Sequence, residues 1–280
     1  LRQGKMLRAL LVFLGCQAAG GDPQHVMTAA AGIELVHTAS LIHDDLMDGA
    51  FTRRGIPSVH IQLGTERAII CGDYLIAKSF RLLAESQTMC VPADVVRAFI
   101  IGSESGIRTC TGQFHDTQKW TADTLTESVY QRIVIEKTSA AIEGALLAGA
   151  ALAGARNDLL SLLQRFGAAI GKAFQIKDDI QDAVWLLHDA QGVDRRITLP
   201  LIYAFNSASR EGKEAILSFL NNEAFDIPQI AGLLQESQAI EQAEGLATSF
   251  TDDALSIASD FAEYADIFCA VARYIVLRNN

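Results

Sequence analysis

The hydrophobic and polar positions of this chain follow a pattern typical of helices. The intervals between its prolines are rich in Ala, Leu, Ile, Glu and Gln, and they lack the β-branched alternation that marks strands. We therefore predict an all-α fold. A polar loop is expected at residues 49–57. The expected helices span residues 7–16, 24–48, 65–85, 92–119, 126–154, 158–185, 200–206, 211–221, 228–248 and 251–278.

The chain is long enough to bury a large core. It has 280 residues, of which 50% are hydrophobic. No Pro/Gly/Ser-rich linker divides it into parts. We therefore expect a single domain over residues 1–280.

The acidic balance of the chain narrows the classes of partner. The formal net charge is −10, whereas nucleic acids and anionic membranes call for a basic surface. The most apolar long stretch, residues 140–155, is interrupted by Glu143 and is short for a bilayer, so we expect no stable membrane insertion. The five cysteines are odd in number and form no metal-binding pattern, which indicates reduced thiols in a cytoplasmic protein.

Two acidic triplets stand out, at residues 44–48 (DDLMD) and 178–182 (DDIQD), and both lie in apolar helical stretches. Positions i and i+4 of a helix lie about 40° apart in projection, so each triplet directs its carboxylates to one region. Like charges at this spacing repel each other. We therefore expect hard cations such as Mg²⁺ between the two triplets, bridged by a polyanionic ligand; zinc is the poorer fit.

Basic residues accompany the acidic triplets. Arg53 and Arg54 follow the first triplet, and guanidinium groups bind phosphate oxygens in a bidentate manner. His37 precedes Asp44 by seven residues and shares its helix face, from which it can donate to a phosphate oxygen. A diphosphate ester explains both the carboxylates and the cations. Three further cations border apolar segments, namely Lys5, Arg8 and Lys137.

The motifs of the chain, taken together, resemble the trans-isoprenyl diphosphate synthases, or polyprenyl synthetases. The order of the motifs also matches that family from residue 4 to about residue 203. The C-terminal helices resemble the family only in general character. The matching segments are 34–48 (ELVHTASLIHDDLMD), 53–55 (RRG), 72–75 (GDYL), 112–113 (GQ), 136–138 (EKT), 171–182 (GKAFQIKDDIQD) and 198–202 (TLPLI).

This resemblance implies an antiparallel helical bundle around a central cavity, in a homodimer, with both triplets at the cavity mouth. It also implies a Mg²⁺ cofactor, with three ions per active site and Mn²⁺ as a possible substitute. The direct metal ligands would be Asp44, Asp48 and Asp178. The residues that support them through water or hydrogen bonds would be Asp45, Asp179 and Asp182.

The resemblance further implies two substrates. An allylic diphosphate (dimethylallyl, geranyl or farnesyl) would ionise and alkylate isopentenyl diphosphate. The catalytic residues would be Asp44, Asp45, Asp48, Lys137, Asp178 and Asp179. The residues that bind the allylic diphosphate would be Arg53, Lys137, Thr138 and Gln175. The residues that bind isopentenyl diphosphate would be Lys5, Arg8, His37 and Arg54.

The length of the product depends on bulk just before the first triplet. In the family, large residues there act as a floor to the product tunnel. This chain has Ala39 and Ser40 at the fifth and fourth positions before Asp44. We therefore expect a product of twenty carbons (geranylgeranyl) or longer. The sequence does not identify the residues of the deeper floor, for which Phe80 is a candidate.

Two segments depart from the family pattern. Met6 and Ala9 replace an Arg and a Pro of the N-terminal signature. The stretch between Asp182 and Thr198 is short and lacks the usual Gly-Lys pair, so its only local cations are Arg195 and Arg196. These departures leave two alternatives: a class I terpene cyclase and a non-catalytic regulatory subunit of a heteromeric prenyl synthase. The pair His43-Asp44 also suggests a metal phosphohydrolase of the HD type, but such enzymes need neither a second acidic triplet nor the Lys-Thr motif.

Overall fold

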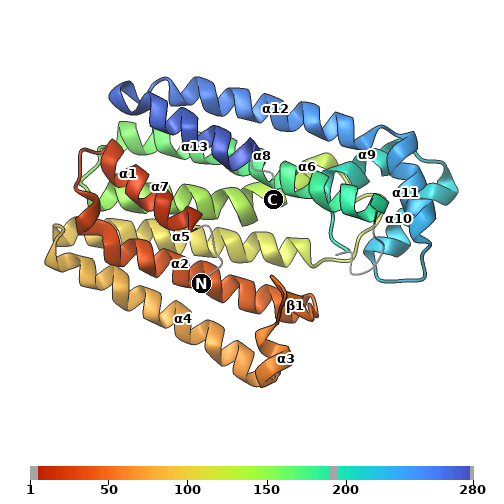
Figure 1. Cartoon of the computed structure of the whole chain (residues 1–280), viewed down its shortest axis with the longest axis horizontal. Coiled ribbons are helices and arrows are strands. Elements are labelled where there is room, and N and C mark those ends of the chain that lie inside the picture. Colours follow the sequence, from red (N-terminus) through yellow and green to blue (C-terminus); the bar gives the residue numbers. More distant parts are fainter. Residues whose placement is uncertain (1–5, 189–194, 278–280) are drawn as a thin grey trace. The chain divides into compact units, whose positions relative to one another are not determined.

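The computed structural model describes residues 6–188 and 195–277, and helices dominate it (Figure 1). About four fifths of the chain, 81%, is helical, so the predicted all-α fold class is confirmed. The helical elements are α1 (Leu7–Ala18), η1 (Pro23–Val26), α2 (Met27–Met47), α3 (Val59–Leu63), α4 (Thr65–Glu85), η2 (Ser86–Thr88), α5 (Pro92–Asp116), α6 (Glu127–Val134), the π-helical turn η3 (Ile135–Ser139), α7 (Ala140–Leu152), α8 (Asn157–His188), α9 (Leu199–Ser207), α10 (Arg210–Leu220), α11 (Ile227–Glu236), α12 (Ala239–Ala258), η4 (Ala262–Tyr264) and α13 (Ala265–Leu277).

The chain forms two compact units. The first comprises Leu1–Ser105 and Ile142–Gln164, and the second comprises Gly106–Ala141 and Arg165–Asn280. The first acidic triplet belongs to the first unit and the second triplet to the second unit. The single domain expected over residues 1–280 stays a prediction, as does a cavity shared by the two triplets.

In the first unit, helix α2 runs alongside α4 and also packs on α1. Glu34 of α2 is only 6% exposed, and its carboxylate accepts a hydrogen bond from the backbone N–H of Ala9, at 2.9 Å. Ala9 lies in the first turn of α1, where backbone N–H groups have no partner within the helix. A carboxylate is also favourable there because the N-terminal end of a helix carries partial positive charge. Glu34 therefore holds the start of α1 against α2.

A small hairpin occupies part of the predicted polar loop. Strands β1 (Thr52–Arg53) and β2 (Ile56–Pro57) pair antiparallel. The two residues between them, Arg54 and Gly55, have positive φ angles of 52° and 74°. Positive φ at both central residues is the geometry of a type I′ turn, which matches the twist of the flanking strands. The turn places Arg53 and Arg54 on a defined support directly after the first triplet.

In the second unit, aromatic and aliphatic side chains fill the core. The rings of Phe166, Phe261 and Phe268 contact one another, and the rings of Phe261 and Phe268 are stacked at 3.7 Å. Asn221 ties the segment after α5 to α10: its amide accepts from the backbone N–H of Trp120 and donates to the backbone carbonyl of the same residue, both at 2.8 Å. Phe166 lies on α8, the helix that also carries the second triplet.

Several predicted helix boundaries were wrong. The break expected at residues 249–250 is absent, because α12 continues through these residues. The hydroxyl of Thr251 donates to the backbone carbonyl of Ala247 within the same helix, at 2.7 Å. The chain instead breaks at Gln238, whose φ is 52°. The helix expected over residues 126–154 is interrupted by the π-helical turn Ile135–Ser139. Such turns insert one residue into a helix and are frequent at functional sites.

One stretch of the described residues, Pro23–Met47, is long and apolar enough to cross a membrane by length and composition. Core helices of many soluble proteins share this length and composition. Here the stretch packs on α1 and α4 and carries the buried acidic residues Glu34 and Asp45.

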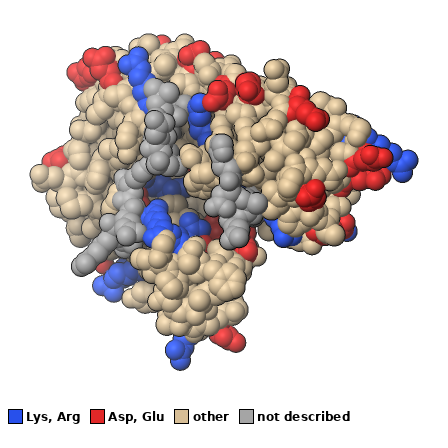
Figure 2. Space-filling view, turned by 45° about the vertical axis from the view of Figure 1, so that its right-hand side comes forward, with Lys and Arg blue, Asp and Glu red and all other residues tan. Residues whose placement is uncertain are grey.

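On the face shown in Figure 2, charged side chains lie in small separate groups among wide uncharged areas.

Candidate active site

The first triplet lies at the C-terminal end of α2. Its middle residue, Asp45, is 3% exposed, whereas Asp48 is exposed and Asp44 is half-buried. Arg53 of the hairpin donates from Nε to both carboxylate oxygens of Asp45, at 2.7 and 2.9 Å, and its Nη2 lies 2.6 Å from Oδ1. The burial of Asp45 is thus compensated by a bidentate ion pair. This pair connects the first triplet to the hairpin, whose Arg53 and Arg54 are predicted to bind diphosphate.

The residue before the triplet contacts α4. The Nε2 atom of His43 lies 3.3 Å from the carbonyl oxygen of Ile69 and 3.8 Å from a carboxylate oxygen of Asp73. Any side chain at Gly72 would collide with the His43 ring, so the helices can approach here only because position 72 is glycine. The motif that begins at Gly72 therefore supports the last turns of α2.

A cationic cluster forms next to His37. Burial, with smaller contributions from the positive charges of Arg8, Arg54 and Arg53, lowers the pKa of His37 to about 3. His37 is therefore neutral near pH 7, and its imidazole can donate a hydrogen bond from one ring nitrogen. The structure thus brings together three residues predicted for isopentenyl diphosphate, from α1, α2 and the hairpin. The fourth, Lys5, lies outside the described residues.

The second triplet lies within α8, and its middle residue is also buried. Asp179 is 2% exposed. Its carboxylate accepts hydrogen bonds from the Tyr130 hydroxyl at 2.6 Å, the Gln175 amide at 2.9 Å and the backbone N–H of Leu199 at 3.0 Å. Burial raises the pKa of Asp179 to about 7, although the three donors act in the opposite direction. Burial also raises the pKa of the Tyr130 hydroxyl well above its usual value, helped by the neighbouring Asp179 carboxylate. The outer residues, Asp178 and Asp182, are half-buried.

The π-helical turn presents the Lys-Thr motif to the same network. The Nζ atom of Lys137 lies 2.6 Å from a carboxylate oxygen of Asp116 on α5. The hydroxyl of Thr138 donates to Gln175 at 2.6 Å, and Gln175 in turn donates to Asp179. The structure therefore joins three of the residues predicted for the allylic diphosphate side, Lys137, Thr138 and Gln175, with the second triplet.

Two glycines allow the neighbouring helices to reach this turn. A Cβ atom on Gly112 of α5 would lie 2.5 Å from the backbone N of Lys137. A Cβ atom on Gly171 of α8 would lie 2.6 Å from the Cα of Ser139. Real Cβ atoms essentially never make contacts that short. The motifs at residues 112–113 and 171–182 are therefore explained in part by close packing around the turn.

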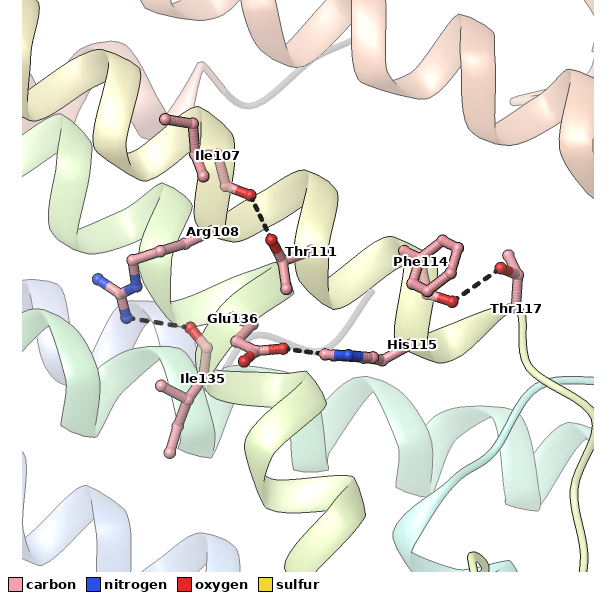
Figure 3. Close-up of polar contacts among 8 residues, drawn as sticks. All are labelled: Ile107, Arg108, Thr111, Phe114, His115, Thr117, Ile135 and Glu136. Carbon is pink, nitrogen blue, oxygen red and sulfur yellow. Dashed lines mark hydrogen bonds and ion pairs between the residues drawn. The ribbon is translucent and has the colours of Figure 1, made fainter.

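Sequence reasoning missed several residues of this site. Asp116 binds Lys137, and Tyr130 binds Asp179. Figure 3 shows two more contacts of the turn, from Arg108 and His115 of α5 to Ile135 and Glu136. Asp116 follows Gly112 by four residues and so shares its helix face, a signal that the sequence does contain. Tyr130 carries no such signal, because its role depends on how α6 packs against α8.

The donor set fits a hard cation such as Mg²⁺. Among residues 6–188 and 195–277, no group of three or more His, Cys, Asp or Glu side chains lies close enough together to hold a metal ion by itself. Mg²⁺ commonly binds through one or two carboxylates, substrate phosphates and waters. The outer aspartates of each triplet are partly or fully accessible, while the middle ones are committed to protein donors. Asp44, Asp48 and Asp178 stay the residues that are predicted to hold the metal.

Comparisons with known proteins identify the family of the chain. The polyprenyl synthetase family matches residues 1–236. The chain is 32% identical to the short chain isoprenyl diphosphate synthase of Methanothermobacter thermautotrophicus, over 92% of this chain and 85% of that protein.

Two solved structures share the fold. A geranylgeranyl pyrophosphate synthetase from the archaeon Geoglobus acetivorans is 30% identical, with a TM-score of 0.85 over 99% of this chain and 89% of that chain. The polyprenyl synthase of Caulobacter crescentus CB15, solved with calcium and isoprenyl diphosphate, is 26% identical, with a TM-score of 0.86 over 99% and 86%. The chain therefore belongs to the polyprenyl synthetase family and is a polyprenyl diphosphate synthase.

Proposed function

We propose that this synthase condenses an allylic diphosphate with isopentenyl diphosphate and forms an all-trans product of twenty carbons or more. The observation that carries this proposal is the presence of two separate sets of cationic residues. One set is the cluster of Arg8, His37 and Arg54, and the other is Lys137 with its contact to Asp116. An enzyme that only ionises one diphosphate needs a single set of cations. A condensing enzyme needs a second set, and that requirement disfavours a terpene cyclase.

On the allylic side, Lys137, Thr138 and Gln175 would hold the diphosphate, together with Arg53. Lys137 exchanges its contact with Asp116 for a phosphate oxygen, and the cationic groups stabilise charge that develops on the leaving diphosphate. Mg²⁺ on Asp44, Asp48 and Asp178 supplies further Lewis-acid stabilisation of that charge when it is bound.

On the acceptor side, Arg8, His37 and Arg54 would hold isopentenyl diphosphate, with Lys5 as a further ligand. The double bond of isopentenyl diphosphate attacks the allylic carbon as the C–O bond between that carbon and the allylic diphosphate group breaks. The resulting tertiary cation loses a proton to the departing diphosphate, which restores neutrality. The neutral imidazole of His37 suits this site, because it can donate to an anion without drawing repulsion from the three arginines.

The proposed chain length rests on the residues before the first triplet. Ala39 is fully buried and Ser40 is half-buried, and neither has the bulk to close a product tunnel. Phe80 of α4 is half-exposed, and its ring lies 5.5 Å from that of Phe99 on α5. This aromatic pair is a candidate for the deeper floor. The geranylgeranyl activity of the Geoglobus relative is in keeping with a product of this size.

We include a homodimer in the proposal. Within the first unit, α4 and α5 expose large apolar side chains, among them Ile70 (64%), Tyr74 (65%) and Ile100 (62%). Apolar patches of this kind usually mark contact surfaces, and a second copy of the chain is the commonest partner for such a surface. Sedimentation analysis should give twice the monomer mass for the wild type, and the mass of the monomer for Ile70→Glu.

A cytoplasmic location is also proposed, since all five cysteines are free thiols.

One assay tests the proposed function. Purified protein is incubated with Mg²⁺, isopentenyl diphosphate and each allylic primer from five to fifteen carbons, and products are sized by mass spectrometry. We expect elongation to twenty carbons or more, and complete loss of product when EDTA removes the metal. A hydrocarbon formed without consumption of isopentenyl diphosphate would indicate a cyclase instead. No product with any primer would indicate a regulatory subunit.

Chain length has its own test. Ala39→Phe should shorten the main product by at least one five-carbon unit, because a ring there reduces the space before the first triplet. Ser40→Phe is a companion variant at a less buried position, where overpacking costs less stability. Unchanged product length in both folded variants would refute this placement of the floor.

A further inference from the structure

The π-helical turn Ile135–Ser139 is bound by a separate partner at each of four consecutive residues. Arg108 donates to the backbone carbonyl of Ile135 at 3.4 Å. Glu136 pairs with His115 at 2.8 Å. Lys137 contacts Asp116, and Thr138 donates to Gln175. Because a π turn departs from the regular hydrogen-bond pattern of a helix, contacts from outside are needed to hold it in one conformation.

The pair of His115 and Glu136 is the part of this arrangement that the reaction chemistry does not explain (Figure 3). A carboxylate only accepts, so the Nδ1 atom of His115 carries the proton and donates it to Oε2 of Glu136. The two side chains are 27% and 22% exposed, so the contact is partly shielded from water. It lies one residue from the Lys137–Asp116 contact on both the turn and α5.

The two contacts adjoin each other on both helices. Two neighbouring residues of α5, His115 and Asp116, bind two neighbouring residues of the turn, Glu136 and Lys137. Without His115, the Glu136 carboxylate would lack its donor, and the turn would lose the contact with α5 that lies beside the contact of Lys137. His115 therefore helps to hold the turn against α5 where Lys137 meets Asp116.

We infer that His115 and Glu136 form a positioning pair, which fixes the π-helical turn so that Lys137 and Thr138 are presented to the allylic diphosphate. Neither residue touches substrate. This inference rests on the proposed function, since it assigns the pair a role in binding one of the two substrates. It predicts a selective effect: the allylic substrate is weakened, and isopentenyl diphosphate, whose proposed ligands lie in the first unit, is not.

Steady-state kinetics with both substrates test the pair. Glu136→Ala and His115→Phe should each raise the KM for the allylic diphosphate about tenfold, with the KM for isopentenyl diphosphate unchanged, because misplacement of a binding group weakens only its own ligand. The double variant should be no worse than either single variant, since each removes the same contact. Glu136→Gln keeps an acceptor oxygen and should restore most of the allylic affinity.

A matched control is Glu214→Ala, which removes the exposed pair of Arg210 and Glu214 on α10 in the same unit and should leave both KM values unchanged. Melting curves separate positioning from stability. A lower melting temperature with an unchanged allylic KM would overturn the inference, and so would an equal rise in both KM values. An inactive wild-type protein would instead count against the proposed function, so the two failures are distinguishable.

Discussion

The two acidic triplets have the same spacing and the same buried middle residue, yet the protein satisfies them by different means. Asp45 is held by the guanidinium of Arg53, a charged group that is 36% exposed. Asp179 is held by three neutral donors, of which Tyr130 is 2% exposed. The first site balances charge with charge. The second site surrounds a carboxylate with dipoles in a dry environment, and burial raises its pKa to about 7.

This comparison shows what the spacing of the triplets achieves. Residue i+1 of a helix is turned about 100° from residue i, whereas residue i+4 returns to nearly the same face. The middle aspartate of each triplet is therefore directed into the protein, and the two outer ones share an accessible face. One carboxylate of each triplet anchors the helix, and the two outer ones stay at least partly accessible. The contacts of the middle residue can therefore differ between the two triplets while the two outer residues keep the same face of the helix.

The largest expected effect is on the condensation rate, and it should come from the outer aspartates of the triplets. Asp44→Ala and Asp178→Ala should each lower the Mg²⁺-dependent condensation rate by at least about 1000-fold, because each removes a proposed metal ligand. The melting temperature should change little, since neither residue is the buried anchor. Product formation and circular dichroism measure the two effects. Asp252→Ala, at an exposed position on α12, is the control. Full activity in either triplet variant would contradict the assignment.

A smaller effect separates the two anchors from each other. Arg53→Ala leaves the buried Asp45 carboxylate without its ion pair and should lower the free energy of unfolding by about 1–3 kcal/mol, reduced by the partial exposure of Arg53. Tyr130→Phe removes one of three donors to Asp179 and should cost about 1–2 kcal/mol.

Salt should distinguish these two losses. Urea unfolding at low and high NaCl measures both. The Arg53→Ala loss should shrink in high salt, because ions screen a partly exposed charge pair. The Tyr130→Phe loss should not, because its contact is buried and the donor is neutral. The same salt response in both variants would show that the two anchors do not differ in the way described here.

Much of the fold could be predicted because amphipathic helices leave a clear pattern. The helix expected at residues 65–85 is observed as Thr65–Glu85. The hairpin was missed because two-residue strands have no detectable periodicity. The break at Gln238 was missed because a left-handed conformation at glutamine has no sequence signal. The π-helical turn was missed because an inserted residue does not change the composition of a helix.

The site was predictable to a similar extent. The triplets and the cations next to them could be located from residue types and spacing alone. Their partners could not, because these come from other helices: Asp116 from α5, Tyr130 from α6 and the backbone of Leu199 from α9. Spacing along one helix shows which residues share a face. It does not show which neighbouring helix that face contacts.

The smallest expected effect concerns the cationic cluster beside the first triplet. Between pH 6.5 and about 3, His37 binds a proton in the unfolded chain but not in the folded protein. The unfolded state then binds more protons, so this group lowers the free energy of unfolding as the pH falls through that range. His37→Gln should therefore give a shallower loss of stability in acid, measured by urea unfolding at a series of pH values, and His25→Gln is the control. Inorganic diphosphate should reduce the difference between wild type and His37→Gln, since an anion bound by Arg8 and Arg54 weakens the repulsion that these arginines add to the larger effect of burial. Identical pH profiles for wild type and His37→Gln would mean that neither burial nor the arginines lower the pKa of His37, and the proposed cluster beside the first triplet would then lose its main support.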